Sequence, residues 1–185
     1  TTPGKSPMRR LTRYEYNNTV RDLLGDTTEP ASSFPAEEEA LGFDNNAAGR
    51  GVSQVHIERY MLAAETLVAN ALRDHRALVI PCDPDDMPYS LCASQTLERF
   101  GKLAYRRYLS GDEKQRYQSY FQSLFDAQMA ETPPATTRAA FDEAISTLFQ
   151  VMLQSPSFLY RVELGEPDDD GDGVADGSDR CPDSG

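Results

Sequence analysis

The sequence predicts an all-α fold, an irregular bundle of about five helices followed by an acidic C-terminal loop. Apolar residues recur at helical spacing in several long segments, capping boxes stand before two of them, and no segment alternates apolar with polar residues as a half-exposed strand does. The chain of 185 residues has room for one ordinary domain with appendages. We expect a linker over residues 1–8, a helical domain over 9–164 and a tail over 165–185.

The first helix is expected to begin at a capping box and to end at a glycine. Thr12 is the predicted cap, Glu15 reaches back to it, and Leu11 and Tyr16 hold the positions of a hydrophobic staple. Gly25 supplies the stop. The buried stripe is predicted to be Tyr16, Val20, Leu23 and Leu24. The connection over residues 26–52 is long for a compact domain, and long connections are often functional.

The second helix is expected to start at Ser53 and to run to about Arg76. Its predicted buried stripe is Ile57, Tyr60, Met61, Ala64, Leu67, Val68, Ala71 and Leu72. The two histidines, His56 and His75, fall near the two ends of this helix. We expect them to act as helix-end residues placed for the helix dipole, rather than as metal ligands.

Cys82 and Cys92 bracket a loop rich in proline and aspartate between two helical patterns. A disulfide closing this loop is predicted, and it would stabilise the fold by about 3 kcal/mol if the geometry allows it. The alternative is a pair of unrelated reduced thiols. A disulfide would indicate an oxidising compartment outside the cytosol.

Three further helices and a short final turn are expected. The first opens at Ser94, and its apolar face is Leu97, Phe100, Leu103, Ala104 and Tyr108. The next starts at the capping box of Ser110 and Glu113, ends before Pro133-Pro134, and carries Tyr117, Tyr120, Phe121, Leu124 and Phe125 on one face. The last long helix is capped by Thr137 and buries Phe141, Ala144, Ile145, Leu148, Phe149 and Met152. Ser155-Pro156 interrupts the pattern before a turn with Phe158, Leu159 and Val162.

The tail carries oxygen ligands at the spacing of a cation-binding loop. Five aspartates, Asp168, Asp170, Asp172, Asp176 and Asp179, fall at positions 1, 3, 5, 9 and 12 of one loop. Gly173 at position 6 permits the sharp turn, and the carbonyl of Val174 at position 7 is the remaining expected ligand. Calcium is the predicted cofactor, because neither histidine nor thiolate lies among the ligands.

Two features separate this loop from an EF-hand and leave an alternative open. Pro167 disfavours a helix leading into the loop, and Asp179 is shorter than the glutamate usual at position 12, which indicates weak affinity. The alternative is a disordered, solvated acidic tail, since runs of like charge usually stay unfolded. The segment from Glu166 to Gly185 holds eight acids and one arginine, so it carries −7 of the net −12.

Several functional classes lack sequence support. No basic stripe favours nucleic-acid binding, and no run of 18 apolar residues predicts a transmembrane helix. Covalent c-type haem is excluded because no C-x-x-C-H occurs, and no nucleophile signature accompanies the two histidines.

The long connection could supply an acid/base pair. Glu37, Glu38, Glu39 and Asp44 are its acidic residues, and the simpler reading is a solvated loop with Asx turns. If the helical domain binds a ligand, we expect it where this loop meets Tyr14, Asn17 and Asn18.

Two resemblances add to these predictions. The string D-x-D-x-D-G-x-x-D-x-x-D-x-C-P from Asp168 resembles one thrombospondin type 3 repeat, which implies an extracellular calcium-binding module. Here there is one copy, and Cys181 has no partner within it. The blocks RRLTRYEYNNTVRDLLG from Arg9, RFGKLAYRRYLS from Arg99 and LQSPSFLYRVE from Leu153 resemble planctomycete-type bacterial surface proteins of unknown function, whose helical modules often accompany c-type cytochrome domains. This second resemblance implies export, a cell-envelope protein partner and a possible lipid anchor before processing.

The expected function is that of a non-catalytic secreted or cell-surface protein, extracellular or periplasmic, which binds calcium through its Asp-rich loop in a structural or interaction role. The rival expectation is an accessory module of an envelope redox or hydrolytic system. A fragment without independent function is a third reading.

Overall fold

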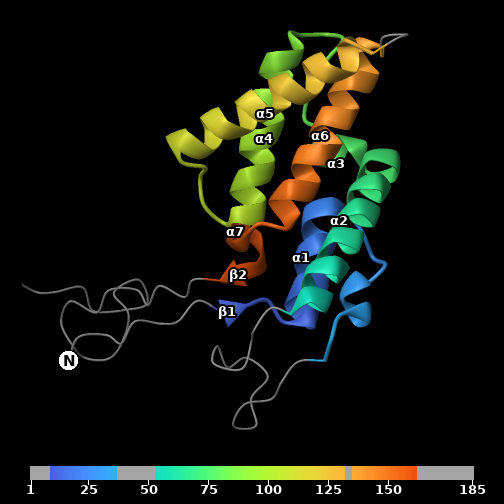
Figure 1. Ribbon diagram of the computed structural model, residues 1–185, viewed down its shortest axis with the longest axis vertical. Helices are drawn as coiled ribbons and strands as arrows, with labels where there is room; N and C mark the ends of the chain where they lie inside the picture. Colours follow the sequence, from blue (N-terminus) through green and yellow to red (C-terminus); the bar gives the residue numbers. More distant parts are fainter. Residues whose placement is uncertain (1–8, 37–52, 132–134, 162–185) are drawn as a thin grey trace, which may run out of the picture.

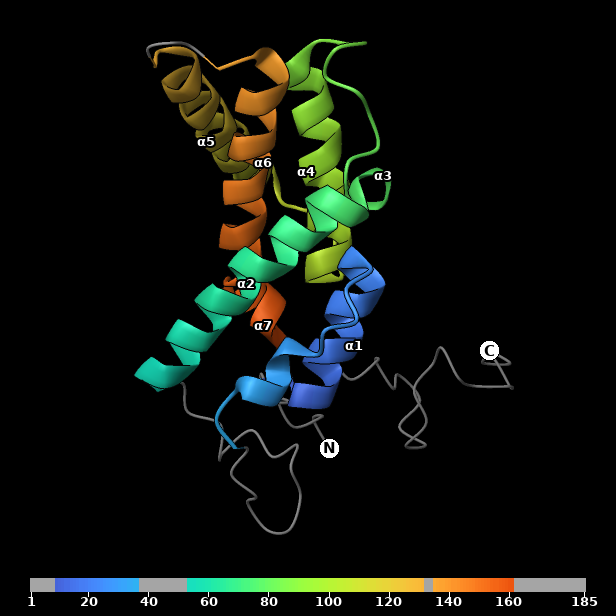
Figure 2. The same cartoon turned by 90° about the vertical axis from the view of Figure 1, so that its right-hand side faces the viewer.

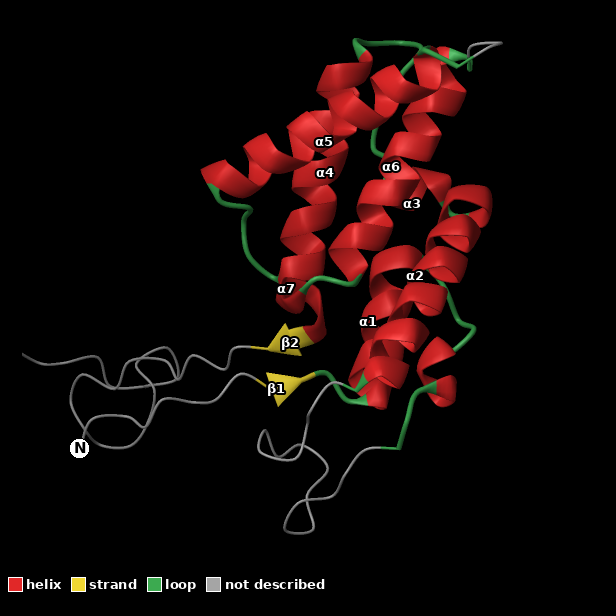
Figure 3. Cartoon of the chain, viewed as in Figure 1, coloured by secondary structure: helices red, strands yellow, loops and turns green. Residues whose placement is uncertain are grey.

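The computed structural model describes residues 9–36, 53–131 and 135–161, and these residues are almost entirely helical (Figures 1 and 3). The elements in chain order are β1 (Arg9–Arg10), α1 (Arg13–Leu24), the 3-10 helix η1 (Pro30–Ser33), α2 (Gln54–Asp74), α3 (Arg76–Val79), α4 (Tyr89–Tyr105), α5 (Gly111–Met129), α6 (Thr137–Leu153), α7 (Pro156–Leu159) and β2 (Tyr160–Arg161). Five of the helices, α1, α2, α4, α5 and α6, exceed a single turn. The predicted all-α bundle of about five helices is therefore confirmed.

Helix α6 is the centre of the bundle. It packs against α5, α2 and α4. Figure 1 shows α4 and α5 to one side of α6 and α2 to the other, and Figure 2 shows α2 running obliquely across the bundle. The whole apolar stripe predicted for α6 is buried, because this helix has neighbours on most of its circumference.

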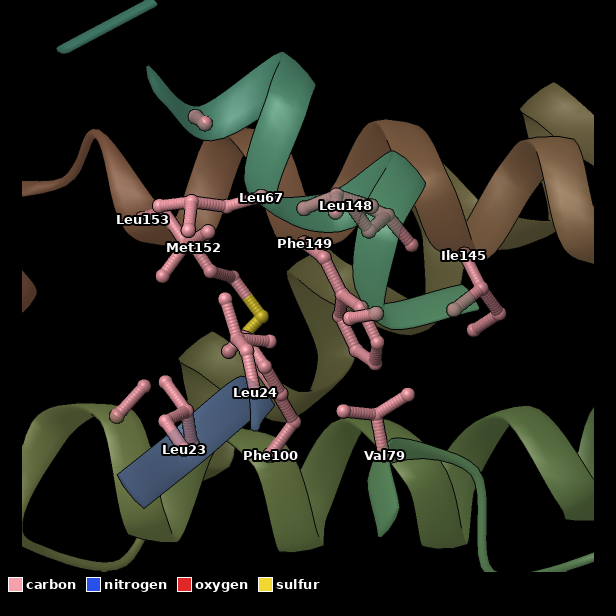
Figure 4. Close-up of a cluster of buried hydrophobic side chains, with 14 of the residues drawn as sticks. Leu23, Leu24, Leu67, Val79, Phe100, Ile145, Leu148, Phe149, Met152 and Leu153 are labelled. Atoms are coloured by element: carbon pink, nitrogen blue, oxygen red, sulfur yellow. The ribbon is translucent and has the colours of Figure 1, made fainter. Parts of the chain in front are cut away.

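The main core lies where α1, α2, α3 and α4 meet α6 (Figure 4). Phe100 of α4 and Phe149 of α6 stack with ring centroids 3.8 Å apart, and both rings are buried. The surrounding side chains are Leu23, Leu24, Leu67, Val79, Ile145, Leu148, Met152 and Leu153. Burial of this apolar surface is the main term that stabilises the fold.

The predicted capping boxes of α1 and α5 are confirmed. The Thr12 hydroxyl accepts the N–H of Glu15, whose carboxylate accepts the N–H of Thr12, and Ser110 and Glu113 form the same pair in α5. Gly25 ends α1 in the left-handed conformation with φ 75°, as its position predicts.

Helix α2 begins after Ser53 as predicted, but its buried face differs from the predicted stripe. Ile57 and Met61 are 58% and 44% exposed, whereas His56 and Ala63 are buried. Tyr60 explains the rotation, because its ring packs against Tyr16 of α1 and Phe34 beyond η1 and so turns this part of α2 toward them. The helix ends at Asp74, two residues before the predicted end, and α3 follows after His75.

Helix α4 starts earlier and ends earlier than predicted. Its first residue is Tyr89 rather than a residue near Ser94, because the Tyr89 ring stacks on Phe125 of α5 at 4.1 Å and so adds a turn to the helix. The helix ends at Tyr105. Tyr108 therefore lies beyond it and is 71% exposed, and Leu103, predicted as buried, is also exposed.

The remaining helices follow the predicted pattern with small shifts. In α5, Tyr117, Phe121 and Phe125 are buried while Tyr120 is half exposed. The cap of α6 is Thr136 rather than Thr137. Ser155 caps the short α7 with Pro156 at its first position, as the interruption predicted, while Pro133, Pro134 and Val162 lie outside the described residues.

The disulfide between Cys82 and Cys92 is present, with Cα atoms 5.7 Å apart. Cys92 was expected in a loop, but it lies in the first turns of α4 and is fully buried. The bond therefore attaches the segment after α3 to the start of α4. Cys181 lies outside the described residues.

A two-stranded ribbon, which the sequence did not indicate, joins the two ends of the described fold. Strands β1 and β2 pair antiparallel, with Arg9 opposite Arg161 and Arg10 opposite Tyr160. Strands of two residues are too short to show alternation, so no pattern could reveal them.

Candidate functional site

The predicted calcium ligands lie outside the described residues. Asp168, Asp170, Asp172, Val174, Asp176 and Asp179 all belong to the segment from 162 onward, and the acidic residues Glu37, Glu38, Glu39 and Asp44 fall in 37–52. Within the described residues, no group of three or more histidine, cysteine, aspartate or glutamate side chains could hold a metal ion. The calcium site remains a prediction from sequence.

The side chains proposed to meet a ligand beside the long connection have structural partners. Asn17 accepts the N–H of Ala31 through Oδ1 at 3.0 Å, which fixes the start of η1 against α1. Asn18 accepts from the Arg21 guanidinium at 2.8 Å on the surface of the same helix. Tyr14 is 77% exposed. Both amides are thus used to hold local structure.

A buried histidine with an unusual role lies at the start of α2. Nδ1 of His56 is 2.8 Å from the Ser53 hydroxyl and accepts the Ser53 N–H, which completes a capping box with histidine where glutamate is usual. In a neutral ring, an accepting Nδ1 leaves the proton on Nε2. Nε2 is buried, with no hydrogen-bond partner in the described part of the chain.

The surroundings of His56 keep its ring neutral. Burial is the first cause that lowers its pKa, and the charges of Arg10 and Arg13 lower it further. This differs from the predicted dipole role, because a cation at a helix N-terminus is unfavourable and the ring avoids that charge. A cavity of about 10 Å³ lined by His56, Tyr60 and Phe34 adjoins the ring. It has room for roughly one water molecule and for no larger ligand.

His75 directly follows α2, near the helix end as predicted, and lies beside a buried carboxylate that the sequence did not single out. Asp26 is 5% exposed and accepts hydrogen bonds from the Thr28 N–H and hydroxyl and from Asn70 of α2. Burial raises its pKa, but these hydrogen bonds and the charge of His75 outweigh that effect, so the net pKa is lowered. The group fastens the chain after α1 to α2 and is a structural feature.

An open groove of about 340 Å³ lies between the start of α4 and the middle of α5. Three of its polar side chains are already paired, since Gln118 donates to Ser94, and Gln122 donates to Asp126. The groove holds no titratable cluster.

Arginines gather where the ribbon meets α7 and the end of α4. Arg9 binds Glu15 through two hydrogen bonds of 2.7 and 2.8 Å, and Arg161 lies 3.8 Å from the same carboxylate. Arg106 donates to the carbonyl of Phe158. Two guanidinium groups, those of Arg9 and Arg161, therefore flank the Glu15 carboxylate in the described structure.

Comparisons with known proteins find a family match for two segments of the helical domain. Residues 9–73 match PSD3, a protein family of unknown function (DUF1587), and residues 92–163 match PSD5, a second family of unknown function (DUF1595). We call residues 9–73 the PSD3 segment and residues 92–163 the PSD5 segment. The PSD3 segment covers β1 to α2, and the PSD5 segment covers most of α4 through β2, so the ribbon pairs the first residues of one with the last of the other. No curated protein and no solved structure matches the chain.

The PSD3 and PSD5 matches confirm the resemblance of the helical part in its coarse form, and the thrombospondin-type resemblance of the tail remains a prediction. None of the helices in the described ranges is long and apolar enough to cross a bilayer.

Proposed function

We propose that this protein is a non-catalytic module of an exported or cell-surface protein, and that it binds calcium through Asp168, Asp170, Asp172, Asp176, Asp179 and the carbonyl of Val174. The observation that carries the proposal is the register of five aspartates and Gly173 within twelve residues. Carboxylates neutralise the ion, and the ion removes the mutual repulsion of the aspartates. Its use is structural, to stiffen the segment that follows the helical domain.

Two features of the helical domain support this proposal. The Cys82–Cys92 disulfide suits an oxidising compartment, where free calcium is high enough for a weak site. Within the described residues, the buried polar groups Asp26 and His56 have structural roles, which fits a rigid helical scaffold. Both features agree with a stable scaffold that presents a binding segment.

The test is a calorimetric titration of calcium into protein stripped with EDTA. We expect saturable binding near one ion per chain, with a dissociation constant on the order of 10⁻⁴–10⁻³ M, as in extracellular calcium modules. Asp170→Ala/Asp172→Ala should abolish the binding. The matched control is Asp169→Ala/Asp183→Ala, which removes two charges of the same segment outside the ligand positions and should retain the site. Equal calcium affinity in both double variants would overturn the proposal.

A second candidate function is an accessory module of a cell-envelope redox or hydrolytic system. The observation that favours it is the presence of PSD3 and PSD5 segments in the order that the resemblance to cytochrome-associated surface proteins implies. Purification from native envelopes should then yield a haem absorbance that follows this chain through size exclusion. Protein that purifies without haem or a stoichiometric partner would remove this candidate.

A further inference from the structure

Two arginines near the last described residues of the chain lack a full counter-charge within the described structure. Arg106 follows α4, and Arg161 ends β2, the last described residue of the chain. Figure 1 shows β2 next to α7, below the end of α4. We call Arg106 and Arg161 the arginine pair.

Arg106 is held in place by its backbone rather than by an anion. It adopts the left-handed conformation at φ 59°, which is uncommon for a residue other than glycine. Its two terminal nitrogens both donate to the Phe158 carbonyl at 3.4 Å, and the guanidinium lies 6.0 Å from the Phe158 ring centroid. A guanidinium has five donors. One neutral carbonyl at long distance therefore leaves most of its binding capacity unused, and the charge of Glu15 compensates its own charge only in part within the described structure.

The neighbouring Arg107 shows what a compensated arginine looks like at this place. Its guanidinium binds both carboxylate oxygens of Glu113 at 2.7 and 2.8 Å. Arg106 has no such partner among the described carboxylates. The two consecutive arginines therefore differ in role. Arg107 stabilises the start of α5, whereas Arg106 presents a charge to a further partner.

Arg161 shares a carboxylate that is already occupied. Glu15 accepts two short hydrogen bonds from Arg9, so Arg161 reaches it only at 3.8 Å, and the Arg161 side chain is 49% exposed. Burial and then the charge of Arg161 lower the pKa of Arg106, and Glu15 only partly opposes this. The two cations thus repel each other, and an added carboxylate between them would relieve that repulsion.

The chain itself supplies carboxylates within reach. Asp168 follows Arg161 by seven residues, a span of up to about 24 Å, and Glu166 to Gly185 carries eight acids and one arginine. A tethered segment acts at an effective concentration on the order of millimolar, far above that of a free acidic peptide. Charge complementarity and tethering together favour this segment over any separate anionic partner.

We propose that the arginine pair binds carboxylates of the Asp-rich segment 166–179 when no calcium is bound, so that calcium and the arginine pair compete for the same ligands. The calcium half of this inference rests on the proposed function. Calcium binding then releases the segment from the helical domain, and the arginine pair sets how much calcium is needed.

Calcium titration of the full chain measures the competition. Arg106→Gln/Arg161→Gln should bind calcium about three- to tenfold more tightly than the unchanged protein in low-salt buffer, since a few exposed ion pairs are lost on binding. The difference should shrink in 0.5 M KCl, where exposed pairs are screened. The control, Arg21→Gln/Arg73→Gln, removes the same charge from arginines paired to their sequence neighbours Asp22 and Asp74, and should change the affinity less than twofold.

A second measurement separates failure of docking from failure of the calcium site. In EDTA, the NMR signals of the Nε–H groups of Arg106 and Arg161 should shift when Asp168, Asp170 and Asp172 are changed to Asn, while those of Arg21 and Arg73 stay in place. These substitutions lie outside the helical bundle, so a loss of folding is not expected to cause the change in the arginine signals. Unmoved arginine signals would overturn the docking, whatever calcium does. If the arginine signals shift but the chain binds no calcium, the docking of the acidic segment is supported. The proposed calcium-binding function and the competition between calcium and the arginine pair are then both wrong.

Discussion

The backbone N–H of Leu11 donates to the carbonyl of Leu159 at 2.8 Å, next to the β1–β2 ribbon. Leu11 precedes α1, and Leu159 ends α7, so this bond joins the first and last parts of the described fold. Helix α2 also packs on α6. The PSD3 and PSD5 segments are therefore two halves of one cooperative unit rather than two independent domains.

We expect residues 9–79 alone to remain largely unfolded. The fragment would expose the face of α2 that α6 covers in the intact domain, and an isolated helix as short as α1 is marginal in water. Circular dichroism and NMR dispersion of 9–79, compared with 9–163, measure this. A fragment that unfolds cooperatively on heating would contradict the single-unit view.

Substitution by alanine is expected to have opposite effects on stability at two helical glycines. A Cβ on Gly101 would lie 2.7 Å from three side-chain carbons of the buried Leu109, whereas nothing lies within 4 Å of a Cβ on Gly111. Gly101→Ala should lower the free energy of unfolding by about 1–3 kcal/mol through overpacking. Gly111→Ala should leave it unchanged or raise it by up to about 1 kcal/mol, because alanine favours the helix. Urea unfolding of both variants decides, and a stabilised Gly101→Ala would contradict the packing.

Removing the disulfide should lower the free energy of unfolding, and a reductant provides an independent test. Cys82→Ala/Cys92→Ala should lower the free energy of unfolding by roughly 3 kcal/mol, as expected for a loop of this size. Dithiothreitol should destabilise the Cys181→Ser chain by a similar amount and leave the double alanine variant unaffected. If reductant changed neither protein in urea unfolding, the bond would contribute nothing to stability.

The buried hydroxyls of Tyr105 and Tyr117 form a hydrogen bond of 2.6 Å between α4 and α5. Tyr117→Phe should lower the free energy of unfolding by about 1–2 kcal/mol, because it removes a partner of the Tyr105 hydroxyl. Tyr105→Phe/Tyr117→Phe should cost less than the sum of the single changes, since neither hydroxyl is then left behind. A double-mutant cycle in urea measures the coupling, and additive losses would mean that the bond contributes nothing.

Much of this fold follows from local signals in the sequence. Capping boxes and Gly25 set their helix ends by contacts within one turn, and the stripe of α6 is buried as its spacing predicts. The predictions are wrong where contacts with distant residues set the start of a helix or its buried face. The stacking of Tyr89 on Phe125 adds a turn to α4, and Tyr60 rotates α2 by packing on Tyr16.

The candidate site also has one part that local spacing can suggest and one part that depends on distant residues. The aspartates of the tail are spaced within one short loop, so a pattern can suggest them, and they lie outside the described residues. Arg106 and Arg161 are 55 residues apart and come together only through α7 and the ribbon. Arg106 follows a helix and Arg161 ends a strand of two residues, and no spacing rule could pair them.

Acid should weaken the fold through the two capping-box glutamates. Hydrogen bonds from Arg107 lower the pKa of Glu113 to about 2, burial opposes this, and the Ser110 N–H lowers it further. Arg9 and Thr12 act in the same way on Glu15, whose pKa is also about 2. A folded pKa below the unfolded value near 4.5 gives stability that is present above pH 4.5 and is lost as the pH falls toward 2.

Glu113→Gln isolates one of these contributions. At pH 7 the variant should lose about 1–2 kcal/mol of unfolding free energy, a figure reduced for the exposure of Arg107, and the difference from the unchanged protein should narrow steadily between pH 4.5 and 2. Asp112→Asn, in the same first turn but in no ion pair of the described structure, should lose less at pH 7. Urea unfolding at several pH values measures both variants. A gap between Glu113→Gln and the unchanged chain that stays constant down to pH 2 would show that the ionised carboxylate of Glu113 does not stabilise the helix start.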